Sequence, residues 1–172
     1  IVASMGEAAS LEAMLEESDL EQVDLAALVA ACVDGYRAAY PDNRFRLDAA
    51  ATGRCPVVPE AIAQALDKLV ANAVDFATPG SEIVVGVEPD GRDCWRIAVA
   101  NQGPHLPSEM AHSLFESMVS VREAARGGAD ARGHLGLGLY LVRLIAEFHG
   151  GTAAARNRPG GVEVGFTIAA VR

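Results

Sequence analysis

The segment that most restricts the possible folds is a predicted β-hairpin near the middle of the chain. Residues 82–88 and 94–100 are rich in Val, Ile and Ala, and they flank Pro89-Asp90-Gly91, whose residue types favour a tight turn. Two strands joined by so short a connection run antiparallel. The fold therefore contains an antiparallel sheet, and a wholly helical fold is excluded.

Helical segments surround this hairpin. Apolar residues recur every three or four positions after Asp24 as far as Pro41, from Pro59 to Phe76, and from 135 to 148, where Gly150-Gly151 ends the pattern. A short helix is expected at 108–115, and further strands at 45–49, 57–58, 152–157 and 162–170. This mixture predicts an α+β fold, a two-layer sandwich whose mixed, mostly antiparallel sheet of about five strands is covered on one face by helices.

Length and composition indicate one intracellular domain. The 172 residues are 51% hydrophobic, which suffices for one core, and Cys32, Cys55 and Cys94 are too far apart to suggest a zinc site or a disulfide framework. No apolar run approaches the ~18 residues of a membrane helix. The formal charge of −9 argues against a nucleic-acid polymer as partner, because phosphate chains are bound by clustered cations.

The first twenty residues are expected to form an amphipathic helix, over 5–20. Its apolar stripe includes Leu11 and Leu15, and a helix this short is marginal alone. Two partners for the stripe remain open. The stripe packs against a partner helix outside this chain, or it packs on the domain that follows.

Four short motifs occur in a fixed order along the rest of the chain. They are LDKLVANAVDFA at 66–77, VANQGPHLP at 99–107, LFE at 114–116 and GLGL at 136–139. Together they resemble the ATP-binding catalytic domain of sensor histidine kinases, which belongs to the gyrase, Hsp90, histidine kinase and MutL superfamily with the Bergerat fold. The resemblance extends from about Asp24 to the end, so 24–172 is expected to be the catalytic domain and 1–20 the C-terminal end of the dimerisation and phosphoacceptor helix. The runs at 115–122 and 139–151 further resemble proteobacterial kinases paired with sortase systems.

The first motif implies a magnesium site. In the family, an asparagine at the position of Asn72 offers its side-chain oxygen to the Mg²⁺ that accompanies ATP, and magnesium prefers oxygen ligands. Lys68 lies one helical turn earlier, where the ATP hydrolases of the superfamily carry a glutamate base; a protonated lysine cannot act as that base, although it could contact phosphate. Asp75 replaces a basic residue that is usual near the phosphates, and Phe76 completes the nucleotide contacts expected from this helix.

The second motif implies adenine recognition. Asn101 takes the place of the family's aspartate, which accepts a hydrogen bond from the adenine amino group, and Gly103 and Leu106 follow as expected nucleotide contacts. An amide both accepts and donates, so adenine recognition survives the exchange, and a rotated amide could also pair with guanine. We therefore hypothesise that Asn101 relaxes the choice of base. His105 replaces a second glycine of the family pattern.

The last two motifs flank the segment that corresponds to the family's ATP lid. Arg122 is its first candidate for a phosphate contact, because arginine offers paired N–H donors. The GLGL run opens a helix whose N-terminal amides would face the phosphates. The expected contacts there are Gly136, Leu137, Gly138 and Leu139.

The resemblance implies a protein histidine kinase that moves the γ-phosphoryl group of ATP to a histidine outside this chain and then to a response regulator. It further implies a homodimer and a cytoplasmic domain attached to a membrane-anchored protein. Two alternatives stay open: a degenerate, non-catalytic interaction module, suggested by Asp75, Asn101, His105 and His134, and an ATP hydrolase, disfavoured by Lys68.

Overall fold

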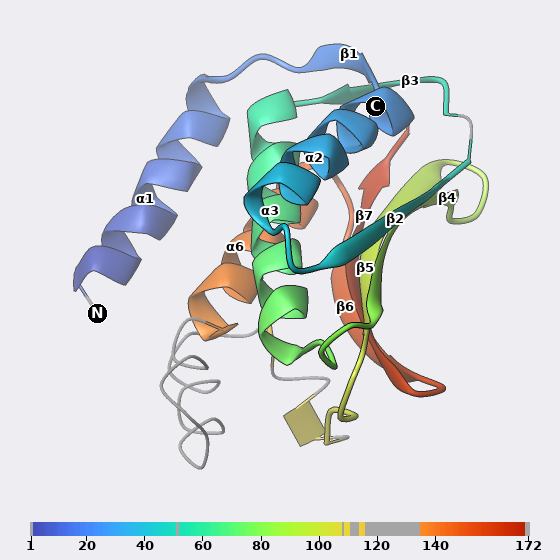
Figure 1. Ribbon diagram of the computed structural model, residues 1–172. Helices are drawn as coiled ribbons and strands as arrows, with labels where there is room; N and C mark the ends of the chain where they lie inside the picture. The colour runs from blue at the N-terminus through green and yellow to red at the C-terminus, as the bar shows by residue number, and fades with distance from the viewer. Residues whose placement is uncertain (1, 51, 108, 111–113, 116–134, 171–172) are drawn as a thin grey trace.

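The computed structural model describes residues 2–50, 52–107, 109–110, 114–115 and 135–170, with only the backbone described for 2–5 and 135–137. Helices cover one face of a five-stranded sheet (Figure 1). The elements in chain order are α1 (Val2–Glu17), β1 (Glu21–Asp24), α2 (Leu25–Ala39), β2 (Arg44–Ala49), β3 (Arg54–Val57), α3 (Pro59–Phe76), β4 (Glu82–Pro89), β5 (Cys94–Gln102), α6 (Leu135–Phe148), β6 (Ala153–Arg158) and β7 (Gly161–Ala169). The predicted fold class is confirmed.

The large sheet has the strand order β2-β4-β5-β7-β6. The predicted hairpin forms, with Pro89 opposite Trp95, and Gly91 takes a φ of 79° in its turn. β4–β5, β5–β7 and β7–β6 are antiparallel, whereas β2 runs parallel to β4. The sheet is therefore mixed and mostly antiparallel, as the sequence predicts.

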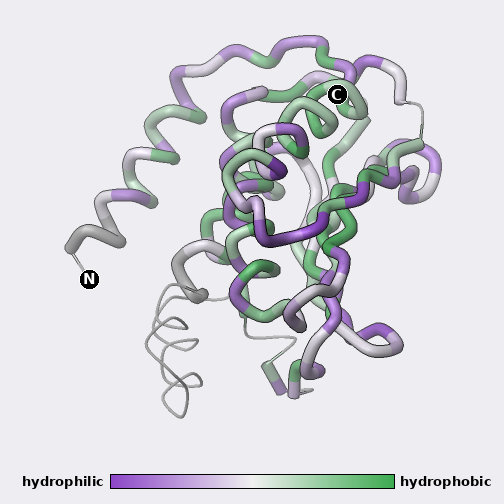
Figure 2. The backbone as a smooth tube through the Cα atoms, in the orientation of Figure 1, coloured by the Kyte–Doolittle hydropathy of each residue, from purple (hydrophilic) through white to green (hydrophobic). Residues whose placement is uncertain are grey.

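The core lies between the sheet and the helices. Alternate residues of β4 and β5 are buried, as are nearly all residues of β7, and the inner face of these strands lies under α2, α3 and α6. Figure 2 shows hydrophobic residues concentrated in these central strands. α3 contributes the largest helical share, because its apolar residues recur at three- and four-residue steps. The buried side chains of α3 are Ala61, Ile62, Ala65, Leu66, Leu69, Val70 and Ala73.

The two central helices α3 and α6 are joined at one end by a histidine. His149 is 2% exposed, and its Nε2 accepts a hydrogen bond of 3.0 Å from the backbone N–H of Val58, the residue that precedes α3. Its Nδ1 lies 2.7 Å from the carbonyl oxygen of Ile145. The imidazole ring therefore accepts from an N–H at the start of α3 that has no partner within the helix, and its other nitrogen contacts α6. The opposite ends of the same two helices carry Asn72, Phe76 and the GLGL run.

The N-terminal helix packs on its own domain. Leu11 and Leu15 are each 4% exposed and belong to the main core, and α1 contacts α6. These two leucines therefore pack on the domain that follows, which is the second of the two alternatives left open by the sequence. The helix ends at Glu17 rather than at Leu20, because the Ser18 hydroxyl donates to the Met14 carbonyl and β1 begins at Glu21.

A second, two-stranded sheet was not expected. β1 pairs antiparallel with β3, with Val23 opposite Cys55, above the ends of α2 and α3 (Figure 1). Asp24, at the end of β1, also caps α2: its Oδ1 accepts from the backbone N–H of Ala27 at 3.2 Å. The small sheet thus fixes where α2 begins.

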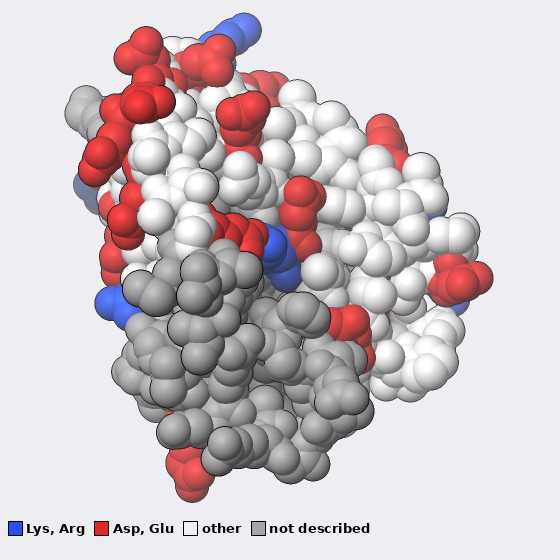
Figure 3. All heavy atoms as spheres, turned by 90° about the vertical axis from the view of Figure 1, so that its left-hand side faces the viewer, with Lys and Arg blue, Asp and Glu red and all other residues white. Residues whose placement is uncertain are grey.

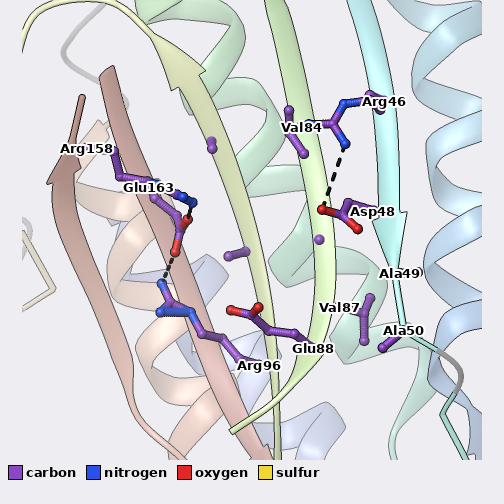
Figure 4. A pocket seen from close by; sticks show the side chains of 13 residues that line it. Arg46, Asp48, Ala49, Ala50, Val84, Val87, Glu88, Arg96, Arg158 and Glu163 are labelled. Atoms are coloured by element: carbon purple, nitrogen blue, oxygen red, sulfur yellow. Dashed lines mark hydrogen bonds and ion pairs between the residues drawn. The ribbon is translucent and has the colours of Figure 1, made fainter. Parts of the chain in front are cut away.

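The face of the large sheet opposite the helices holds a cluster of charges. Glu163 of β7 is buried, and its carboxylate pairs with Arg96 of β5 at 2.6 Å and with Arg156 and Arg158 of β6. Figure 4 shows Glu163 between Arg158 and Arg96, over a hollow whose floor is formed by small residues of the central strands. Because every charge in this cluster has a partner, we interpret the cluster as structural.

Within the described residues, no helix combines the length and the apolar character needed to span a bilayer.

Candidate functional site

A pocket at one end of α3 brings together five of the predicted site residues. It lies between α3, β5, β7 and α6, and it contains two amides and otherwise apolar side chains. Its predicted members are Asn72, Phe76, Asn101, Leu106 and Leu139, and they are joined by Pro104, Leu114, Val162 and Val164. Residues from four separate motifs therefore meet at one place.

The pocket suits an uncharged group. None of the described residues that line it carries an ionisable side chain. Binding pockets of this type enclose ligands with apolar walls and fix their orientation with a few polar atoms. Here the polar atoms are the side-chain amides of Asn72 on α3 and Asn101 on β5.

Asn72 carries a buried oxygen that has no partner. Its Oδ1 is the one buried side-chain polar atom without a hydrogen bond among the described residues. An unpaired buried acceptor costs about 1–3 kcal/mol, so such atoms are rare unless they serve a ligand. A magnesium ion accepts a single protein oxygen and completes its shell with water and phosphate oxygens. Asn72 therefore fits the predicted metal role.

Asn101 is held in place at the end of β5. Its side chain faces inward, the residue is 7% exposed, and Nδ2 donates a hydrogen bond of 3.1 Å to the carbonyl oxygen of Gln102. This bond favours one of the two orientations of the amide. In that orientation Oδ1 is the atom available to accept from a ligand.

Gly103 is required by the close approach of two chain segments. A Cβ at this position would lie 2.5 Å from the carbonyl oxygen of Phe76, and the φ of 153° is one that other residues rarely adopt. The adjoining hydrogen bond from Thr78 N–H to the Gln102 carbonyl, at 2.8 Å, ties the end of α3 to the end of β5. Gly103 thus brings the two amide-bearing elements together.

Lys68 lies outside this pocket. Its Nζ pairs with Glu7 Oε1 of α1 at 2.9 Å, and its aliphatic stem faces Gly138 at the start of α6, where a Cβ would lie 3.5 Å away. Lys68 lines a groove between α1, α2 and α3 instead. In that groove the Tyr36 hydroxyl donates to Asp67 at 2.5 Å, and burial and this bond raise the tyrosine's pKa.

The remaining predicted site residues fall into two groups. Asp75 is exposed near the end of α3, and Gly136 and Leu137 belong to the first turn of α6, where only the backbone is described. Arg122, together with the rest of the expected lid, lies outside the described residues.

Sequence reasoning missed some residues of the pocket wall. Val162 and Val164 of β7 belong to it because β7 pairs with β5 and their side chains face the helices. The alternation along β7 could have placed both on the inner face. Pro104 and Leu114 lie within the quoted motifs but were given no role.

No cluster of three or more His, Cys, Asp or Glu side chains that could hold a metal occurs in the described part of the chain. The three cysteines are free thiols, and burial raises the pKa of Cys32 and Cys55. A metal at this pocket would therefore have Asn72 as its protein ligand, with other oxygens supplied by its companion ligand.

Comparison with known proteins shows the family of the chain. Residues 57–171 match the family model described as histidine kinase-, DNA gyrase B-, and HSP90-like ATPase. The sensor histidine kinase GtrS of Pseudomonas aeruginosa is 28% identical over 151 residues, which cover 87% of this chain and 29% of GtrS.

Solved structures share the fold. The ATP binding domain of PrrB from Mycobacterium tuberculosis superimposes with a TM-score of 0.66 at 25% identity, covering 89% of this chain and 98% of that one. Full-length ShkA in complex with AMPPNP gives a TM-score of 0.77 at 22% identity, covering 99% of this chain and 35% of that one.

The chain spans between 8% and 36% of the length of eight curated relatives that it matches, which are sensor proteins and histidine kinases. Because the family model covers most of the chain, including four of the described sheet strands, α3 and α6, the chain belongs to the family of histidine kinase-, DNA gyrase B- and HSP90-like ATPases.

Proposed function

We propose that this chain is the ATP-binding catalytic domain of a sensor histidine kinase. The observation that carries the proposal is the unpartnered, buried oxygen of Asn72, which shares a pocket with the inward-facing amide of Asn101. An oxygen for a metal and an amide for a base, joined by apolar walls, suit a purine nucleotide accompanied by Mg²⁺. The solved complex of ShkA with AMPPNP supports the same ligand class.

Each element has one task in this proposal. The base lies between Phe76, Leu106 and Val164, and Asn101 Oδ1 accepts from its amino group. Asn72 would hold the metal, which would neutralise phosphate charge. The first turn of α6, with Gly136, Leu137, Gly138 and Leu139, offers backbone N–H groups and the positive end of the helix dipole to the phosphates.

The proposed reaction is phosphoryl transfer. The bond between the γ-phosphorus and the β,γ-bridging oxygen breaks, a phosphorus–nitrogen bond forms on a histidine imidazole outside this chain, and ADP leaves. The imidazole N–H proton passes to solvent. Neither Lys68, whose ammonium pairs with Glu7, nor any pocket side chain is a base that could activate water. This absence of a base among the described pocket residues favours transfer over hydrolysis.

The surroundings of the domain follow from the same proposal. Residues 1–20 are the end of the dimerisation and phosphoacceptor helix, the whole protein is a homodimer, and a response regulator receives the phosphoryl group. The domain then lies on the cytoplasmic side of the membrane. Arg122 is the proposed cation of the lid that approaches the phosphates.

Thermal unfolding with and without nucleotide tests the proposal. ATP with Mg²⁺ is expected to raise the Tm of the chain, because a ligand at 100 times its Kd adds about 2.7 kcal/mol of stability. Asn72→Ala should lose the part of the shift that depends on Mg²⁺ and keep the part that ATP alone produces. Arg37→Ala, on the exposed side of α2, is the control and should behave like the unchanged chain.

Absence of any Tm shift with ATP and Mg²⁺ would refute nucleotide binding and favour the non-catalytic interaction module. Release of inorganic phosphate by the chain alone would instead indicate an ATP hydrolase. Transfer of label from the γ-phosphate of ATP to an acid-labile, base-stable adduct on the longer protein would identify a phosphohistidine, as proposed.

A further inference from the structure

The loop after β5 forms one wall of the pocket, and it follows the last residue pair of the β5–β7 ladder. The pairing of β5 with β7 ends at Gln102 opposite Gly161, and the backbone N–H of Gly103 makes one more bond, of 3.0 Å, to the Gly160 carbonyl. Pro104 and Leu106 follow and line the pocket. Their position depends on contacts other than a strand ladder.

One side chain replaces the missing strand partner. Asn157 on β6 accepts a hydrogen bond from the Leu106 backbone N–H through Oδ1 at 2.8 Å. Its Nδ2 donates to the Leu106 carbonyl oxygen, also at 2.8 Å. A primary amide is suited to this double contact, because it carries a donor and an acceptor side by side in one plane.

A second contact lies one residue away on each segment. The Nε2 of His105 lies 2.7 Å from the carbonyl oxygen of Arg158. His105 is the residue that stands in place of a family glycine, so its ring provides a contact that a glycine cannot make. The loop is therefore fastened to the β6–β7 hairpin by side chains at two successive residues.

We infer that Asn157 is a positioning residue for the nucleotide base, which it serves through Leu106 without touching the ligand. The inference rests on the proposed function. By fixing both backbone polar groups of Leu106, the Asn157 amide holds that side chain in the pocket opposite Phe76 and Asn101. Pre-ordering a wall residue spares the ligand the entropy cost of ordering it on binding.

Two variants and one control test this role. Asn157→Ala removes both bonds, and Asn157→Asp keeps the size and the acceptor but cannot donate to the Leu106 carbonyl. Arg156→Ala, one residue earlier on the opposite face of β6, is the control. Titration calorimetry on the whole chain should give an ATP Kd up to about tenfold weaker for Asn157→Ala, the cost of ordering one wall side chain on binding.

Two further readouts separate positioning from mere structural support. The loss should be the same with and without Mg²⁺, because it arises at the base end of the pocket. The urea midpoint without nucleotide should stay close to that of the unchanged chain. The Leu106 amide resonance should shift in both Asn157 variants, and its hydrogen exchange should accelerate in Asn157→Ala, which lacks the acceptor. If the alanine variant does not fold, the ATP Kd of Asn157→Asp, the more conservative exchange, tests the same inference.

An unchanged ATP Kd in both Asn157 variants, with normal ATP binding by the unchanged chain, would overturn this inference and leave the proposed function intact. A loss confined to the Mg²⁺-dependent part of binding would overturn it as well. Failure of the unchanged chain to bind ATP would refute the proposed function itself.

Discussion

Lys68 Nζ lies 2.9 Å from Glu7 Oε1, and this ion pair joins α1 to the helix that carries Asn72. It crosses from the N-terminal helix to α3, one turn before the proposed metal ligand. Figure 3, which faces α1, shows that acidic side chains outnumber basic ones on the described part of this surface. On this acidic side of the molecule, a carboxylate of α1 already engages Lys68.

We expect Lys68→Ala to retain Mg²⁺-dependent ATP binding. The ammonium is engaged by Glu7, and Lys68 does not line the pocket, so the Kd should change by less than about threefold. Both partners are more than one-third exposed, so the free energy of unfolding should fall by no more than about 1 kcal/mol. Titration calorimetry and urea unfolding measure the two effects. A tenfold or greater loss of affinity would instead make Lys68 a phosphate ligand.

Asn72→Ala should separate stability from function. The substitution removes a buried acceptor that has no partner. The free energy of unfolding of the unliganded chain should therefore stay unchanged or rise by about 1 kcal/mol, whereas removal of a paired buried polar group usually lowers it. Urea unfolding without nucleotide measures this change. A loss above about 2 kcal/mol would mean that the Asn72 oxygen contributes to folding, contrary to the role proposed for it.

The choice between ATP and GTP should depend on Asn101. To pair with guanine its amide must rotate and give up the bond to the Gln102 carbonyl, which costs about 1 kcal/mol, or about fivefold in affinity. A carboxylate cannot donate at all, so Asn101→Asp should reject GTP more strongly. Competition titrations compare the ATP-to-GTP ratio in the two proteins. Equal ratios would contradict the hypothesis of relaxed base choice.

Gly103→Ala should unfold the chain more easily than a glycine substitution made where the added Cβ has room. The new Cβ would lie 2.5 Å from the Phe76 carbonyl oxygen, which is a backbone atom and cannot move aside as a flexible side chain can. The free energy of unfolding should therefore fall by at least about 2 kcal/mol. Gly35→Ala is the matched control, because no atom lies within 4 Å of its Cβ and alanine is favoured in the helix α2, by about 0.5–1 kcal/mol. Similar urea midpoints for both variants would show that the close approach at Gly103 is not rigid.

The cap of α2 should make stability depend on pH. Hydrogen bonds from the Ala27 N–H and the Thr52 hydroxyl lower the pKa of Asp24 below its ordinary value of 3.8. A lowered pKa means that the folded state prefers the ionised form, so this contribution is complete above that value and is lost as pH falls through the folded-state pKa. Asp24→Asn caps without titrating. The difference in unfolding free energy between the unchanged chain and Asp24→Asn should therefore shrink below about pH 4. A difference that does not depend on pH would contradict this prediction.

The elements that could be predicted from the sequence are those with a local cause. α3 follows from its apolar period and from the Thr78-Pro79-Gly80 break, and the β4–β5 hairpin follows from its turn. The β1–β3 pair could not be predicted, because Glu21-Gln22-Val23-Asp24 is polar and shows no alternation of apolar residues. Those strands pair because the fold brings two distant segments together.

The site shows the same division. Asn72 and Asn101 could be placed because each stands in a motif of the family. Asn157 could not, since a polar residue on an edge strand is typical of a solvated surface, and its role appears only when β6 lies beside Leu106, 51 residues away in the chain. Lys68 occupies a motif position, but its ion-pair partner could not be predicted, because Glu7 lies 61 residues away in the chain.

The parallel pairing of β2 with β4 also bears on how the protein assembles. Arg44 pairs with Glu82, and both β3 and α3 lie in the chain between them, so α3 is the crossover of this pair. Contacts between such distant residues raise the contact order and slow folding. A nascent chain that has not yet produced β4 exposes the apolar face of α3, because the sheet that covers it is still missing. The helix that carries Asn72 is then a segment that needs protection from aggregation during synthesis.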